Sequence, residues 1–381
     1  GVTGRTVTKQ GAGTLILSGN NSYGGLTVVE QGTLQVKHNN ALGSTLNGTQ
    51  VKSGGTLALE NGITITDEVL NLSGSGVSNL GALRNLTNTT NTYDGAIFLE
   101  GDSVIHSENG ATLTLNKAIN STNGIHALSV TGGGSIIANG AVGNFTALSA
   151  LTAQASLLSV NGGSIRTTGS QTYNGATNFA AGTTLTTTNN GAISGNGQIT
   201  AAGTLTMASG NGAIDLQNSA NDLQDSANDF ATVTVTNAGT VSLIDANALT
   251  LAGVNASGDV NIATLTNDLT ISGNVNTTST TSTALTLNAG KNENAGTASG
   301  GNIVIATGGS VNAGANGTAR LYSGSYSSAD KSLAMLVNPT STNSGRFRYN
   351  SDEVDQNYST ALSTGLNAIY RERAELSVTP N

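Results

Sequence analysis

Short runs of alternating apolar and polar residues recur along the chain, and glycine- or asparagine-rich turns separate them. The clearest copies begin with Gly-Thr-Leu, at residues 13–17, 32–36 and 55–59. Side chains two residues apart in a strand point to the same face, so Leu, Val and Ile gather on one face and Thr, Ser and Asn on the other. The pattern therefore predicts many short strands, each with one apolar face.

The spacing of these runs predicts how the strands bury their apolar faces. A short strand cannot bury such a face alone, and a repeat of roughly 20 residues is typical of a chain wound into stacked coils. Parallel coils about 4.8 Å apart would satisfy the backbone groups above and below each strand. We therefore expect an all-β fold, a parallel β-helix (β-solenoid), built as a single elongated and monomeric rod.

Composition supports this interpretation and excludes several classes of protein. The 381 residues include 51 Gly but only 2 Pro, and aromatic residues make up 3%. Few prolines suit a chain that is mostly strand ladder, and few aromatics suit a narrow aliphatic core. Without cysteine, the chain has no disulfides, zinc–thiolate sites or thiol catalysis. A net charge of −8 argues against nucleic acid as a partner, and no apolar run reaches the ~18–20 residues of a membrane helix.

The repeats divide the chain into a long stalk and a short final segment. Residues 1–345 are expected to form the β-helical stalk, with repeats clearest in 1–115 and 171–207 and looser ones in 228–345. Charge density rises sharply from residue 346, so residues 346–381 are predicted to be an exit segment or linker to a further module.

Two stretches interrupt the alternation. Residues 144–160 are rich in Ala and Leu, which predicts one short helical excursion. Residues 219–229 contain a duplicated seven-residue motif, which is expected to loop outward.

The repeats resemble those of known bacterial exoproteins. Residues 11–36 resemble the autotransporter-associated β-strand repeat, in which Gly-x-Gly-Thr-Leu-x-Leu-Ser-Gly-x-Asn-x-Tyr is followed by a second Gly-Thr-Leu. Residues 81–115 are similar to the continuation of that repeat, and residues 228–349 resemble filamentous-haemagglutinin-like exoproteins. The resemblance implies a right-handed parallel β-helix, secreted by a Gram-negative bacterium or held at its outer-membrane surface, without catalytic, cofactor or metal sites.

The same resemblance implies an adhesive function. The chain would be the passenger or stalk of an adhesin associated with virulence, which presents loops and polar faces to protein or glycan on host cells or matrix. An outer-membrane secretion partner is expected, and the export route, autotransporter or two-partner, stays open. The alternatives are a β-helical carbohydrate-active enzyme (polysaccharide lyase or glycosidase) and a ligand-free spacer. No ligand-binding residue can be assigned from the sequence.

Several residues could carry chemistry, and each has a simpler structural interpretation. Gly101-Asp-Ser-Val is similar to the motif around a serine-protease nucleophile, but Val104 stands where the second glycine is needed. The three histidines are far apart in the sequence and lack the spacing of a zinc site. They are His38, His106 and His126.

Acidic residues offer a second set of candidates. Asp222, Asp225 and Asp229 could gather a calcium ion, although the segment lacks the calcium-roll pattern. The adjacent pairs Asp67-Glu68 and Asp352-Glu353 should point to opposite faces, with no cationic partner predictable nearby.

Three tyrosines recur in similar motifs and could bind sugar or fill the corners of the coil. They are Tyr23, Tyr93 and Tyr173, and packing at the corners is the preferred interpretation.

Overall fold

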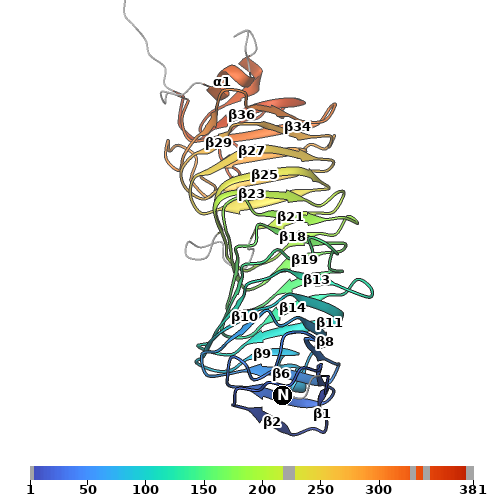
Figure 1. Ribbon diagram of the computed structural model, residues 1–381. Helices are drawn as coiled ribbons and strands as arrows, with labels where there is room; N and C mark the ends of the chain where they lie inside the picture. Colours follow the sequence, from blue (N-terminus) through green and yellow to red (C-terminus); the bar gives the residue numbers. More distant parts are fainter. Residues whose placement is uncertain (1–3, 218–227, 327–331, 338–343, 375–381) are drawn as a thin grey trace, which may run out of the picture. The chain divides into compact units, whose positions relative to one another are not determined.

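The computed structural model describes residues 4–217, 228–326, 332–337 and 344–374. The chain divides into two compact units, unit 1 (Gly1–Thr200) and unit 2 (Ala201–Asn381). Both are parallel β-solenoids, with about 16 turns in total (Figure 1). The all-β, β-solenoid fold class predicted from the alternating pattern is confirmed.

Unit 1 consists of short strands joined by turns and one 3-10 helix, η1 (Val77–Asn79). Its strands are β1 (Val7–Lys9), β2 (Thr14–Leu17), β3 (Thr27–Val29), β4 (Gly32–Val36), β5 (Thr49–Val51), β6 (Gly55–Leu59), β7 (Thr64–Thr66), β8 (Leu70–Gly74), β9 (Leu83–Asn85), β10 (Thr90–Asp94), β11 (Ile97–Ser107), β12 (Thr112–Leu115), β13 (Ile119–Ser121), β14 (Leu128–Thr131), β15 (Ser135–Ala138), β16 (Leu151–Ala153), β17 (Leu157–Val160), β18 (Ser164–Thr167), β19 (Gln171–Tyr173), β20 (Ala176–Phe179), β21 (Thr184–Thr187) and β22 (Ile193–Ser194).

Unit 2 is also built of short strands joined by turns. Strand β23 (Ile199–Ala208) begins in the last two residues of unit 1, and the rest of it belongs to unit 2. Its strands are β24 (Ile214–Leu216), β25 (Asp229–Ala238), β26 (Val241–Asp245), β27 (Leu249–Ala256), β28 (Val260–Thr264), β29 (Leu269–Ile271), β30 (Asn274–Thr277), β31 (Leu285–Ala289), β32 (Ile303–Ile305), β33 (Ser310–Asn312), β34 (Thr318–Ser323), β35 (Phe347–Arg348) and β36 (Gly365–Tyr370). Its helices are α1 (Ser332–Val337) and η2 (Ser344–Arg346).

The Gly-Thr-Leu repeats stack in register in unit 1. Strands β2, β4 and β6 pair in parallel, which places Leu15 beside Leu34 and Leu34 beside Leu57. Leu34 and Leu57 are fully buried, whereas Leu15 on the first coil is 38% exposed. Leu34 and Leu57 are thus covered by the coils on both sides of them, and this stacking is what buries the apolar face.

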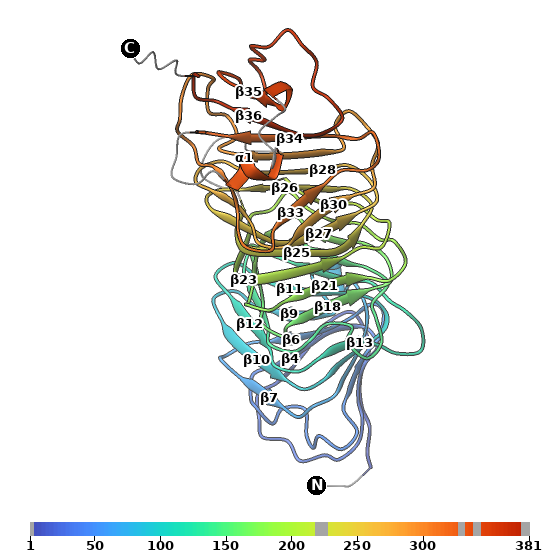
Figure 2. The ribbon, with the colours of Figure 1, turned by 90° about the horizontal axis from the view of Figure 1, so that it is seen from above.

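Unit 2 is held together by equivalent rows. Along β26, β28, β31, β34 and β36, one inward residue of each strand lies beside the next, and every member is fully buried. The row consists of Leu243, Ile262, Leu287, Leu321 and Ala368. Helix α1 packs on β32 and β36 at the last coils of this unit (Figure 2).

Two of the three recurrent tyrosines belong to the core. Tyr93 on β10 and Tyr173 on β19 are fully buried. The Tyr173 ring lies 5.4 Å from that of Phe179 in an edge-to-face contact. Tyr23 is half-buried, and its hydroxyl lies 2.8 Å from that of Thr27. The rings of Tyr93 and Tyr173 therefore pack in the core, in line with the preferred interpretation, although they lie on strands rather than at corners.

The helical excursion predicted for residues 144–160 is wrong. These residues contain strands β16 and β17, and their buried side chains are two residues apart. Leu151 and Ala153 are buried in β16, and Leu158 and Val160 in β17. The spacing of two aligns with the ladders of neighbouring coils, and burial there outweighs the helical propensity of Ala and Leu.

The other predicted boundaries are only partly described. Most of residues 219–229 lies outside the described residues, so the predicted outward loop stays a prediction. The boundary at residue 345 also stays a prediction; beyond it, β36 pairs in parallel with β34. Among the described residues, no helix is long and apolar enough to cross a membrane.

Candidate functional site

Aromatic side chains are concentrated in the last coils of unit 2. The chain has 8 Tyr and 5 Phe, and six of these 13 lie between residues 322 and 370. The rings of Tyr349 and Tyr370 are stacked with centroids 5.4 Å apart, and Phe347 stacks on Tyr370 at 6.4 Å. Tyr326 meets both Tyr349 and Tyr370 edge-to-face. This cluster stands out because the buried core of the described residues is mostly aliphatic, with only a few aromatic side chains such as Tyr93.

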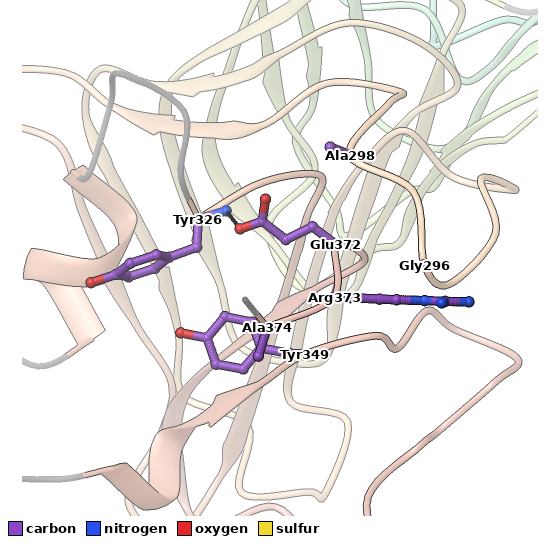
Figure 3. Close-up of a pocket in the computed structure, with 7 residues that line it drawn as sticks. All are labelled: Gly296, Ala298, Tyr326, Tyr349, Glu372, Arg373 and Ala374. Atoms are coloured by element: carbon purple, nitrogen blue, oxygen red, sulfur yellow. Dashed lines mark hydrogen bonds between the residues drawn. The ribbon is translucent and has the colours of Figure 1, made fainter. Parts of the chain in front are cut away.

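A cavity of about 620 Å³ opens beside the cluster (Figure 3). Its lining combines two aromatic rings, one acidic and one basic side chain, and small residues of the facing loop. The lining residues are Gly296, Ala298, Tyr326, Tyr349, Glu372, Arg373 and Ala374. Its volume is that of a small-molecule site, and few convergent polar groups among apolar ones are typical of such sites.

Glu372 fixes one wall of the cavity. Its carboxylate accepts a hydrogen bond of 2.6 Å from the Ser325 hydroxyl and another from the backbone N–H of Tyr326. Figure 3 shows this second bond beside the Tyr326 ring. Both carboxylate oxygens are therefore engaged in holding the segment that carries Tyr326. Tyr326 is 37% exposed and so presents part of its ring to the cavity.

Arg373 lies on the opposite side of the cavity, beneath the loop at Gly296 (Figure 3). It is exposed, and it makes no hydrogen bond or ion pair with any residue that the structure describes. Gly296 has a φ of 91°, and a Cβ at this position would lie 3.3 Å from Nε of Arg373. The absence of a side chain at Gly296 thus leaves room for the guanidinium.

A buried arginine holds the loop that faces the cavity. Arg371 is fully buried, and its Nη2 donates to the carbonyl oxygens of Ala289, Ser299 and Gly301 at 2.6, 3.0 and 3.1 Å. Burial lowers the pKa of Arg371, and the nearby carboxylates of Glu353, Glu293 and Asp352 oppose that change. These bonds tie residues 289–301 to the end of β36.

The pair Asp352-Glu353 supports the same loop. Asp352 is buried and accepts the backbone N–H of Ala295 at 2.7 Å, and Glu353 accepts that of Asn292 at 2.7 Å. No cationic partner could be predicted for this pair from the sequence, and in the structure the charge of Arg371 interacts with both carboxylates. Both carboxylates bind backbone amides, which is a structural use rather than a catalytic one.

The pair Asp67-Glu68 points to opposite sides, as predicted. Asp67 is exposed, whereas Glu68 is 2% exposed and accepts a 2.7 Å hydrogen bond from the Thr49 hydroxyl. Burial raises the pKa of Glu68 to about 7, and the Thr49 bond acts against this rise. In unit 2, burial likewise raises the pKa of the fully buried Asp245 to about 7. Both groups lie in the interior, where they cannot touch a substrate.

The serine-protease-like motif is part of a strand. Ser103 is buried in β11, and its hydroxyl donates to the carbonyl oxygens of Leu72 and Gly101 at 3.0 and 2.8 Å. Asp102 accepts the backbone N–H of Ala127 at 2.8 Å. Ser103 therefore has no access to a substrate and its hydroxyl is engaged with backbone.

The histidines and the acidic loop also lie apart. His106 Nδ1 is 2.9 Å from the Thr131 hydroxyl, and burial lowers the pKa of His106. His38 accepts the backbone N–H of Asn40. Asp222 and Asp225 lie outside the described residues, and Asp229 accepts a hydrogen bond from the Asn247 side chain. Within the described ranges, no three His, Asp or Glu side chains are grouped as metal ligands would be.

The sequence alone predicted neither a ligand-binding residue nor this cavity. The concentration of Tyr and Phe after residue 322, together with the charge density after residue 346, was the available signal. Aromatic side chains and arginine are enriched at binding surfaces. In this chain the two trends coincide at the last coils of unit 2.

Residues 7–36 match the family model of the passenger-associated-transport-repeat. This confirms the resemblance predicted for residues 11–36 and is consistent with an autotransporter passenger repeat. No curated protein and no solved structure gives a significant match to the chain.

The repeat and the β-solenoid fit an autotransporter passenger stalk. This family implies a secreted or surface location, and it favours a structural, non-enzymatic domain. The haemagglutinin-like resemblance of residues 228–349 stays a prediction.

Proposed function

We propose that the chain is the stalk of a bacterial surface adhesin, which holds binding surfaces away from the cell and attaches to protein or glycan on host cells or matrix. The observation that carries the stalk function is the in-register stacking of the Gly-Thr-Leu repeats in β2, β4 and β6. A rigid parallel ladder of this kind spaces surfaces apart without needing a ligand of its own.

Outward polar rows supply one set of contacts. Thr64, Thr92 and Thr114 lie beside one another on β7, β10 and β12 of unit 1. The side-chain amide of Asn139 donates a 2.9 Å hydrogen bond to that of Asn116, and the amide of Asn161 donates one of 2.9 Å to that of Asn139. Repeated hydroxyls and amides at fixed spacing favour weak contacts that gain strength by multivalency.

Exposed apolar side chains and the cavity supply more specific contacts. Phe145 is 82% exposed and Ile125 is 52% exposed, both on turns of unit 1. In unit 2 the cavity beside Tyr326 and Tyr349 has the aromatic lining that suits a small ligand. In this proposal the chain reaches the surface through an outer-membrane secretion partner.

Binding of the purified chain to host cells, extracellular matrix and a glycan array tests the adhesive function. Saturable binding to any of these surfaces supports it. A complete lack of binding, together with an intact β-sheet circular dichroism spectrum, favours a ligand-free spacer. Release of reducing ends from pectin, chitin or mannan would instead favour the carbohydrate-active enzyme.

A further inference from the structure

Arg373 is the one arginine of residues 346–374 that has no structural partner among the described residues. Arg346 donates to the carbonyl oxygens of Thr364 and Leu366 at 2.9 Å, and Arg348 donates to that of Gly345 at 2.8 Å. Arg371 donates to three carbonyl oxygens in the interior. Arg373, which lines the cavity, makes no such bond with any described residue.

The neighbouring acid does not neutralise Arg373. Glu372 binds the Ser325 hydroxyl and the Tyr326 backbone N–H, and it forms no ion pair with Arg373. Figure 3 shows Glu372 directed toward Tyr326, and Arg373 extended along the other side of the cavity. The cavity thus has a free cationic side and a side whose acid is already bound.

The aromatic rings define the other part of the ligand. The rings of Tyr326 and Tyr349 have centroids 6.1 Å apart at an interplanar angle of 76°, so they form two walls that meet at an angle. Aromatic faces pack against flat, weakly polar ligand surfaces such as the C–H face of a pyranose ring. A volume of about 620 Å³ accommodates a mono- or disaccharide rather than a long polymer segment.

We propose that this cavity binds a carboxylate-bearing sugar residue, with Arg373 binding the carboxylate and Tyr326 and Tyr349 packing on the ring. This inference rests on the proposed adhesive function and names the class of ligand for the cavity. A guanidinium matches a carboxylate with two parallel hydrogen bonds, which a neutral sugar cannot provide. Sialic acids and uronic acids share this chemistry.

A peptide carboxylate fits the site less well. One common mode of peptide recognition adds the peptide to a free strand edge, where backbone hydrogen bonds supply affinity. Strand β36, which leads into the cavity, already pairs with β34 and β35. A sugar does not need a free strand edge, so the pairing of β36 favours a sugar over a peptide as the ligand of this cavity.

Titration of the whole chain with matched sugars tests the proposal. The probes are 3′-sialyllactose against lactose, and a glucuronic-acid disaccharide against its glucose counterpart, followed by NMR or calorimetry. We expect binding of at least one acidic sugar and at least tenfold weaker binding of its neutral counterpart. The two acidic probes distinguish a sialylated surface from a uronic-acid-rich matrix.

Substitution then locates the site. Arg373→Gln should weaken binding of the acidic sugar roughly 10- to 100-fold, because hydrogen bonds to charged groups are the strong ones. Arg166→Gln removes an exposed arginine of unit 1 and should leave the affinity unchanged. Tyr326→Ala should weaken the acidic and neutral sugars together, and its ring is partly exposed, so the fold should tolerate the change.

Three outcomes would overturn the inference. They are equal binding of acidic and neutral sugars, acidic binding that Arg373→Gln leaves unchanged, and binding of a short peptide with a free carboxylate but of no sugar. Adhesion is measured separately on cells and matrix. A chain that adheres yet binds neither acidic sugar refutes this inference alone, whereas one that binds the sugar but no surface refutes the adhesive function.

Discussion

Glu68 is a carboxylic acid buried inside unit 1, and its replacement by glutamine should change how stability depends on pH. The side chain is 2% exposed and keeps a single hydrogen bond to a side chain, from the Thr49 hydroxyl. Glutamine has nearly the same shape, and its side-chain oxygen can accept the same bond. The substitution therefore removes the titration while preserving the packing.

The magnitude follows from the pKa of Glu68. Burial raises this pKa from 4.5 to about 7 in the folded protein, so the folded state holds the proton more tightly than the unfolded state. The resulting stability is fully present below about pH 4.5 and is lost as the pH rises through 7. A difference of roughly 2.5 pKa units corresponds to about 3 kcal/mol in the free energy of unfolding.

Urea denaturation at pH 4.5, 6 and 8 measures the effect. At pH 8, Glu68→Gln should be more stable than the native chain by up to about 3 kcal/mol, and at pH 4.5 the two should agree within about 1 kcal/mol. Asp67→Asn alters the exposed neighbour of Glu68 and should change stability by less than about 0.5 kcal/mol at every pH. A difference between native and Glu68→Gln that stays constant with pH would refute the reasoning.

Three further predictions concern the stacked coils. Leu57→Ala should lower the free energy of unfolding, measured by urea denaturation, by about 2–5 kcal/mol, because Leu57 is fully buried in its row. Leu15→Ala on the first coil should lower it by less than half as much, because Leu15 is 38% exposed. Asn139→Ala removes two exposed side-chain hydrogen bonds and should cost about 0.5–1 kcal/mol, again by denaturation. Ile16→Lys places a charge on β2, where Ile16 is 51% exposed, and should change the free energy of unfolding by less than about 0.5 kcal/mol in the same assay.

The sequence pattern predicts the strands and their register best where the repeat is strict. In β4 and β6, Gly-Thr-Leu occupies the same position in each coil, so the alternation alone identifies Leu34 and Leu57 as inward residues. Asp67 and Glu68 lie between β7 and β8, and Asp67 has a φ of 55°, so their opposite orientation comes from the turn rather than from strand alternation. Which of the two is buried does not follow, because it depends on how the turn before β8 enters the coil.

Contacts between distant segments could not be predicted. Arg371 binds carbonyl oxygens 70 to 82 residues earlier in the chain, and no local pattern connects these positions. The same holds for the cavity, whose walls come from residues 296–298, 326, 349 and 372–374. Aromatic and charged composition marks this part of the chain, but only the coil path brings the residues together.

Disulfide cross-linking tests most directly whether successive coils stack in parallel and in register. The chain has no cysteine, so introduced pairs report without interference. Thr114 on β12 lies beside Ile137 on β15, which in turn lies beside Ser159 on β17, and all three are partly exposed. Neighbouring strands are about 4.8 Å apart, which is within reach of a disulfide, whereas two coils span roughly 10 Å and are not. The stacked-coil account predicts rapid oxidation of Thr114→Cys/Ile137→Cys and none of Thr114→Cys/Ser159→Cys; the reverse result, or equal oxidation of both pairs, would contradict it.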